Sequence, residues 1–116
     1  MNMICEEEKV HSQVVSEVSS NLPDDDTLYE VADLFKIFGD STRTKIISAL
    51  FVGELCVCDI VKITNMTISA VSHQLRILRT SSLVKARKSG KEVFYRLSDD
   101  HVKKIYEMAI EHVREK

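Results

Sequence analysis

The sequence predicts a mainly α-helical fold that carries one small β-hairpin. Two observations lead to this prediction: apolar residues recur at intervals of three and four along most of the chain, and one β-rich stretch surrounds Ser89-Gly90. At 116 residues, of which 44% are hydrophobic, the chain can build a single modest core. We expect a flexible acidic tail over residues 1–22, with a loose helix over residues 9–18, and one folded domain over residues 23–116.

The first two helices of this domain follow Pro23, the only proline. Asp24–Asp26 suit the positive end of a helix dipole, and Gly39 is expected to end the first of the two helices. Asp40 is a good N-cap for the second helix, which Gly53 closes. The apolar sides of the two helices consist of Leu28, Val31, Ala32, Leu34, Phe35 and Phe38, and of Ile46, Ile47, Leu50 and Phe51.

The remaining elements are three further helices and the hairpin. A short helix over residues 56–63 is followed by a turn at Asn65-Met66, and Thr67 then caps a longer helix. Residues 83–88 and 92–97 form the two arms of the hairpin. Ser98 is expected to cap the closing helix, which runs to about residue 114. The inward faces consist of Ile68, Val71, Leu75 and Leu78 in the longer helix and of Val102, Ile105, Ala109 and Val113 in the closing helix.

The order of elements and the distribution of charge both favour a DNA-binding unit. The net charge is -2, but residues 41–98 carry ten basic and three acidic groups, whereas residues 1–40 carry two basic and ten acidic groups. Two short helices joined by a tight turn and followed by a basic hairpin describe a winged helix-turn-helix. The expected DNA-contacting residues are Ser69, Ser72, His73, Gln74 and Arg76 on the longer helix and Arg87, Lys88 and Lys91, with Lys85, on the hairpin. The alternative is an ordinary polar helix beside an ordinary hairpin.

The closing helix carries four potential metal ligands, Asp99, His101, His112 and Glu115. Eleven residues of α-helix bring His101 and His112 back to the same face, but about 16 Å apart along the axis, too far for one ion. Two antiparallel copies of the helix would bring the first pair of one copy to the second pair of the other, giving two equivalent sites. The alternative is a set of exposed polar residues on a charged helix.

The three cysteines suggest a second, softer metal site. Cys56 and Cys58 are one residue apart at a helix start, and Cys5 is the only other thiol that could join them. All three thiolates could form a trigonal site for a large soft ion, or a fourth ligand could complete the site. The candidates for that fourth ligand are His11, Glu6–Glu8 and Asp59. The alternatives are a small buried cysteine pair and an idle thiol at position 5.

In the combination ELCVCDI, SAVSHQLRILR and LVKARKSGKEVFYRL, the chain resembles the ArsR/SmtB family of metal-sensing bacterial repressors, from about residue 28 to residue 115. The resemblance implies a homodimer, formed through the N-terminal and closing helices, that binds operator DNA and releases it on binding Cd(II), Pb(II) or Zn(II). It makes SAVSHQLRILR the recognition helix and RKSGKEVFYRL the wing. The family's closing-helix zinc pattern is matched at all four positions, and related sensors complete the Cys-x-Cys site with N-terminal Cys, or with Cys and His.

Two other kinds of regulator would depend on cysteines at the same place in the chain. A thiol-redox regulator would oxidise the same cysteines, and an arsenite-responsive repressor would need a third cysteine soon after the pair, where Ile60-Val61 stands. We expect no enzyme, because a nucleophile–base–acid set and a phosphate-binding glycine loop are both lacking. We also expect a cytoplasmic chain without a membrane partner, since the acidic start is unlike a secretory signal. The family resemblance implies that the genes the chain controls serve metal efflux or resistance. A reducing compartment would disfavour a stable disulfide.

Overall fold

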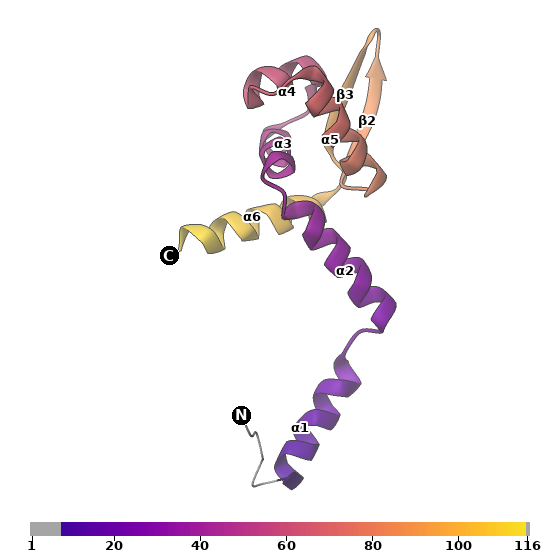
Figure 1. The fold of residues 1–116 in the computed structure, drawn as a ribbon, viewed down its shortest axis with the longest axis vertical. Helices are drawn as coiled ribbons and strands as arrows, with labels where there is room; N and C mark the ends of the chain where they lie inside the picture. Colours follow the sequence, from indigo (N-terminus) through magenta and orange to yellow (C-terminus); the bar gives the residue numbers. More distant parts are fainter. Residues whose placement is uncertain (1–7, 116) are drawn as a thin grey trace. The chain divides into compact units, whose positions relative to one another are not determined.

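The structure is a computed structural model that describes residues 8–115. Its elements are α1 (Glu8–Asn21), α2 (Asp25–Phe38), α3 (Ser41–Val52), β1 (Leu55–Cys56), α4 (Val57–Thr64), α5 (Ile68–Thr80), β2 (Val84–Ser89), β3 (Glu92–Leu97) and α6 (Asp100–Arg114). They occur in the predicted order, and the mainly helical winged helix-turn-helix is confirmed (Figure 1). The chain divides into two units between Asp33 and Leu34, and the core lies in the second.

The core is built where α3 and α5 meet the sheet. Ile46, Ile47 and Leu50 of α3 are buried, as the helical spacing predicted. Val71, Leu75 and Leu78 of α5 are buried against the same core, at most 1% exposed. Burying a side chain of this size stabilises the fold by about 1.5–3 kcal/mol, so these six residues fix how α5 is held. Ile68 was expected on the same face but is exposed, because it is the first residue of α5 and extends beyond the core.

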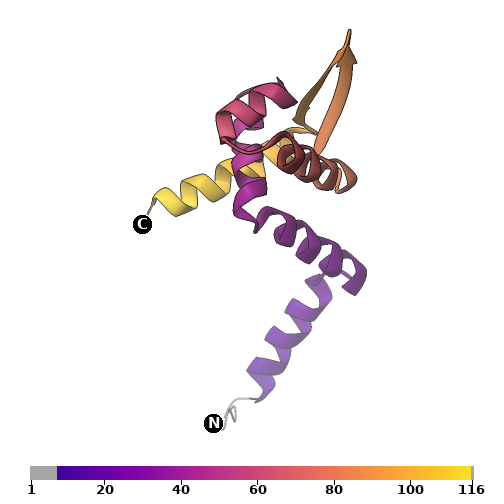
Figure 2. The ribbon, with the colours of Figure 1, turned by 45° about the horizontal axis from the view of Figure 1, so that its top comes forward.

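Helices α4 and α5 form the helix-turn-helix. Asn65 ends α4 in the left-handed conformation with φ 57°, and its backbone N–H donates to the carbonyl oxygen of Val61. Thr67 caps α5, as expected, with its Oγ1 accepting from the backbone N–H of Ala70 at 3.1 Å. The chain thus turns within Asn65–Thr67, and the α5 face opposite the core is open to a partner (Figure 2).

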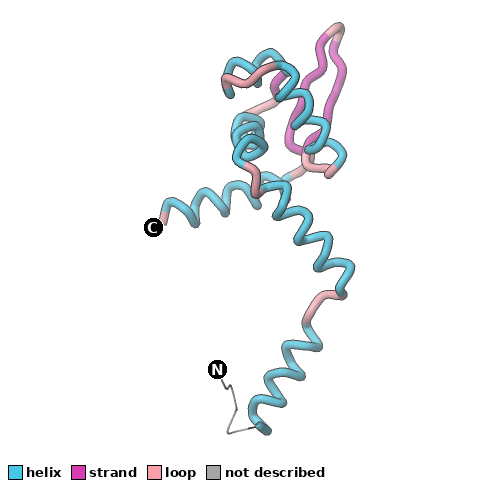
Figure 3. Tube along the Cα trace, viewed as in Figure 1, coloured by secondary structure: helices cyan, strands magenta, loops and turns pink. Residues whose placement is uncertain are grey.

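A three-stranded antiparallel sheet in the order β1-β3-β2 replaces the two-stranded hairpin that the sequence predicted. The hairpin itself is confirmed, with Gly90 at φ 62° in its turn, and its tip extends away from the helices (Figures 1 and 3). The additional strand β1 is two residues long and places Cys56 opposite Phe94 of β3. The segment that carries the cysteine pair is therefore hydrogen-bonded to the wing.

The closing helix differs from the prediction at its start and along its apolar side. Asp99, not Ser98, is its N-cap, with Oδ1 accepting from the backbone N–H of Val102 at 3.1 Å. Ser98 instead ends the wing, where its N–H donates to the carbonyl oxygen of Leu83. Val102 is buried, but Val113 at the other end of the predicted stripe is 58% exposed. In the described chain, no helix combines the length and apolar character that crossing a membrane requires.

Candidate nucleic-acid interface and metal ligands

The exposed face of α5 carries four of its five predicted DNA contacts in the open. Ser69, Ser72, His73 and Arg76 are exposed, because the residues between them are those that turn into the core. The fifth, Gln74, is half-buried, and its Oε1 accepts from Nη1 of Arg43 at 3.2 Å. This bond turns the amide oxygen of Gln74 toward α3, a contact across 31 residues that no local pattern indicates.

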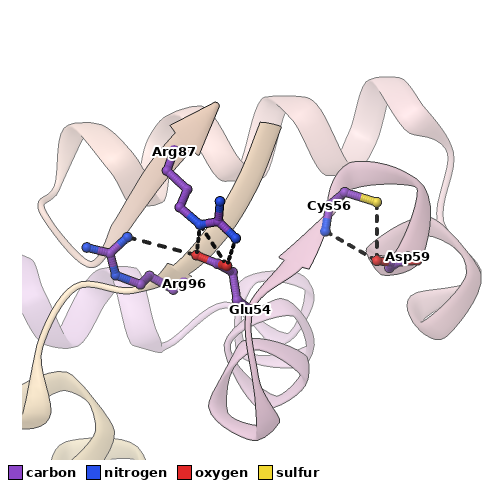
Figure 4. A network of polar contacts seen from close by, with 5 residues as sticks. All are labelled: Glu54, Cys56, Asp59, Arg87 and Arg96. Atoms are coloured by element: carbon purple, nitrogen blue, oxygen red, sulfur yellow. Dashed lines mark hydrogen bonds and ion pairs between the residues drawn. The ribbon is translucent and has the colours of Figure 1, made fainter. Parts of the chain in front are cut away.

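The wing carries its predicted cations in two different settings. Lys88 and Lys91 are exposed on either side of the turn at Gly90, where they are free to approach a phosphate. Arg87 is paired with Glu54: Arg87 Nε donates to both carboxylate oxygens at 2.9 Å, and Arg87 Nη2 donates to Oε1 at 2.6 Å (Figure 4). Sequence reasoning missed Glu54, since it lies 33 residues away.

The environment of Glu54 favours its ionised form. The hydrogen bonds from Arg87 are the main cause that holds the pKa of the Glu54 carboxyl below its usual value, and the positive charge of Arg96, with Nη1 at 3.9 Å, acts in the same direction. The same pair raises the pKa of Arg87. Glu54 is therefore a carboxylate at neutral pH. Because half of the Arg87 side chain is exposed, the ion pair contributes little to the stability of the fold. Its main effect is to fix the orientation of the Arg87 guanidinium.

A basic hollow of about 340 Å³ lies at the base of the wing. It is lined by Arg79, Ser82, Val84, Lys85, Ala86, Arg96 and Ser98. Lys85 stands directly opposite Arg96 across β2 and β3, an arrangement that costs stability unless an anion lies nearby. Arg79 and Arg96 were not among the predicted DNA contacts, and only the positive charge of the segment pointed to them.

The cysteine pair lies at the start of α4. Cys56 is half-buried and its Sγ lies 3.2 Å from Oδ2 of Asp59, which also accepts from the Cys56 backbone N–H at 3.3 Å. Cys58 is exposed in the first turn, and both residues are free thiols in the described chain. Thiols and a carboxylate are donor types that suit a soft divalent ion, but in the described residues these three do not gather closely enough to form a site by themselves. Cys5, the predicted third thiol, lies outside the described residues.

The four predicted ligands of α6 lie as two pairs at opposite ends of the helix. Asp99 and His101 are at its start, with Nδ1 of His101 3.7 Å from Oδ1 of Asp99. The hydrogen bond from the Val102 N–H is the main cause that lowers the pKa of Asp99, and Oδ2 is left for another partner. His112 and Glu115 are exposed at the other end. Among residues 8–115, no three His, Cys, Asp or Glu side chains gather closely enough to hold an ion.

Comparison with known proteins identifies the DNA-binding region and covers nearly the whole chain. The profile described as "Bacterial regulatory protein, arsR family" matches residues 40–86, from the cap of α3 into β2. A transcriptional repressor SmtB homolog from Synechocystis is 39% identical over 97% of this chain and 85% of its own length. A cadmium resistance regulatory protein CadC homolog from Staphylococcus aureus is 40% identical over 97% and 93%. The crystal structure of the antimony-specific repressor AntR superposes with a TM-score of 0.74 at 31% identity, over 82% of this chain and 86% of that one.

Proposed function

The chain belongs to the arsR family of bacterial regulatory proteins, and we propose that this transcriptional repressor releases operator DNA when it binds a divalent metal ion. One observation carries the proposal: Cys56 is at once the cap of α4, the first helix of the DNA-binding motif, and the partner of a wing strand. A ligand bound to this thiol therefore acts directly on the wing and on the helix that precedes α5 in the DNA-binding motif. The chain is a regulator and not an enzyme.

On the DNA side, α5 enters the major groove and its exposed face reads base edges. Ser72, His73 and Arg76 offer short and long donors for this purpose, and Ser69 lies at the N-terminal end of the helix, which reaches deepest in motifs of this kind. Lys88 and Lys91 hold phosphates from the wing. Operator binding then has a specific part on α5 and a salt-dependent part on the hairpin.

A homodimer is proposed because α6 leaves both apolar and metal-binding groups without a partner in one chain. Met108 and Val113 are 65% and 58% exposed. An antiparallel second copy would cover such side chains and would bring Asp99 and His101 of one copy to His112 and Glu115 of the other. The resulting ligand set of two imidazoles and two carboxylates suits Zn(II).

At the thiol site, Cys5, Cys56 and Cys58 are the proposed ligands of Cd(II) or Pb(II), with Asp59 as a candidate fourth ligand. The similarity of this chain to the S. aureus relative, which is described as a cadmium resistance regulator, supports this choice of metal. Regulated genes for metal efflux or resistance, and action in the cytoplasm, follow from the same proposal. The metal acts as an inducer only to the extent that it binds the DNA-free form more tightly.

The test is a titration of metal into the protein–DNA complex. The DNA is a fluorescent duplex that the protein itself selects from a random pool, and anisotropy reports its release. Cd(II) or Zn(II) should release the duplex, whereas Mg(II), which prefers oxygen ligands, should leave it bound. Unchanged operator affinity at saturating Cd(II) and Zn(II) would sink the proposal.

A second candidate, a thiol-redox repressor, rests on the two free thiols at Cys56 and Cys58. Oxidation needs no metal, so release by peroxide that persists in the presence of a chelator would favour this alternative. An arsenite-type or antimonite-type response is the other variant, since AntR is described as antimony-specific. Titration with trivalent arsenic in place of Cd(II) separates it.

A further inference from the structure

Glu54 connects the cysteine segment to the wing, and its carboxylate determines how Arg87 is presented. It follows Gly53, the end of α3, and directly precedes β1, so it lies two residues before Cys56. Two residues of extended chain span only about 7 Å. Figure 4 shows the Glu54 carboxylate turned toward Arg87 and Arg96, on the sheet side of the segment that leads into Cys56 and Asp59.

The pairing of strands gives a second link between the cysteine segment and Arg87. Phe94 of β3 is the register partner of Cys56 on one side and of Arg87 on the other. The guanidinium carbon of Arg87 lies 5.0 Å from the centre of the Phe94 ring, within the range of a cation–π contact. Arg87 is therefore held from two sides, by the ring of Phe94 and by the carboxylate of Glu54.

The pairing leaves one edge of the guanidinium open. An arginine has five N–H donors, and Glu54 engages the Nε donor and one donor of Nη2. Both N–H groups of Nη1 and the second N–H of Nη2 remain, and together they match the geometry of a phosphate. A fixed arginine loses less side-chain freedom on binding DNA than a mobile one.

We propose that Glu54 is a positioning residue that presents the free edge of Arg87 to a DNA phosphate and transmits metal binding at Cys56 to the wing. The proposal rests on the function proposed above. A metal ion held by Cys56 would need its sulfur as a thiolate, so the thiol proton would leave and the hydrogen bond to Asp59 at the start of α4 would be lost. Because Glu54 is two residues from Cys56, a change at the start of α4 would also shift the Glu54 carboxylate and weaken its hydrogen bonds to Arg87. The wing contact is then weakened from the metal site without passage through α5.

The test compares Glu54→Gln, Arg87→Gln and the double variant with wild type, on the selected duplex with and without Cd(II). Glu92→Gln is the matched control, because it removes the same charge from an exposed position near the wing tip. Because an exposed ion pair contributes only a modest free energy, Glu54→Gln should lower the ratio of the DNA affinity without Cd(II) to the DNA affinity with Cd(II) by only about fivefold. The ultraviolet thiolate band of bound Cd(II) and the melting temperature should stay as in wild type.

The double variant should bind DNA no more weakly than Arg87→Gln alone, because Glu54 acts only through Arg87. A Glu54→Arg/Arg87→Glu exchange keeps an ion pair but moves the cation off the wing strand: it should melt like wild type and still bind DNA weakly. A Cd(II)-induced loss of DNA affinity in Glu54→Gln equal to that in wild type, or additive losses in the double variant, would overturn the inference. If wild type itself keeps its DNA in Cd(II), the proposed function fails, and the metal-free double-mutant cycle alone decides whether Glu54 positions Arg87.

Discussion

The two ends of α6 can be tested for cooperation between chains by mixing two variants. His101→Ala and His112→Ala each remove one imidazole and leave the cap at Asp99 and the buried Val102 in place. Both histidines are exposed, so neither change should disturb the core. A background of Cys5→Ser, Cys56→Ser and Cys58→Ser removes all three proposed thiol ligands, so that α6 alone is left to bind Zn(II).

The expected stoichiometry follows from helix geometry. At 1.5 Å per residue, His101 and His112 of one chain stand about 16 Å apart, while zinc–nitrogen bonds are about 2.0–2.1 Å long. Each site must then take one histidine from each chain. Either variant alone damages both sites of its dimer, and losing a ligand should cost more than the roughly 10–100-fold in affinity that a lost second-shell partner costs.

The mixed dimer is the informative species. When one chain carries His101→Ala and the other His112→Ala, both losses fall in the same site and the other site is intact. Two different affinity tags purify the mixed dimer, and competition with a coloured chelator counts its tight Zn(II). The account predicts about one tight ion, against about two for the background dimer and none for each variant dimer. A mixed dimer with none would refute the exchange of ligands between chains, and so would one with two.

Four further substitutions test other parts of the account. Cys5→Ser should weaken the ultraviolet thiolate band of Cd(II); an unchanged band would exclude position 5 as a ligand. Leu75→Ala, in a side chain that is 1% exposed, should lower the free energy of unfolding by about 2–5 kcal/mol in urea melts, and a loss below 1 kcal/mol would contradict the packing of α5. Arg76→Ala should weaken the binding free energy for the selected duplex by about 1–3 kcal/mol and hardly change binding to random DNA. Lys91→Ala should weaken binding to both duplexes and reduce the slope of log affinity against log salt concentration by about one. The opposite pattern would mean that Lys91 reads bases and Arg76 holds a phosphate.

The sequence predicted best what local physics controls. Asp40 and Thr67 cap their helices as expected, because a short acceptor before an apolar periodic segment satisfies the free N–H groups at a helix start. The burial of Ile47 and Leu75 followed from helical spacing. At the closing helix, Ser98 and Asp99 are both good caps and adjacent, so the pattern could not choose between them.

What the sequence could not predict depends on partners distant along the chain. β1 is only two residues long and exists because β3 pairs with it, so it has no periodicity of its own. The bonds of Glu54 to Arg87 and of Arg43 to Gln74 span 33 and 31 residues, and each changes the role expected of a predicted DNA contact. The apolar side of α6 is buried at Val102 but exposed at Val113. A sequence pattern cannot tell such a partly buried helix from one that is buried along its whole length.

The central claim is that metal and operator DNA bind this repressor in mutual opposition, and the most direct measurement is the affinity of Cd(II) for the free and the DNA-bound protein. Linkage requires that DNA weaken Cd(II) binding by the same factor by which Cd(II) weakens DNA binding, a factor of about 5–150 for typical couplings. Calorimetric titration of Cd(II) into the protein alone and into its complex with the selected duplex gives both values. The account predicts weaker Cd(II) binding in the complex, and equal affinities in the two titrations would contradict it.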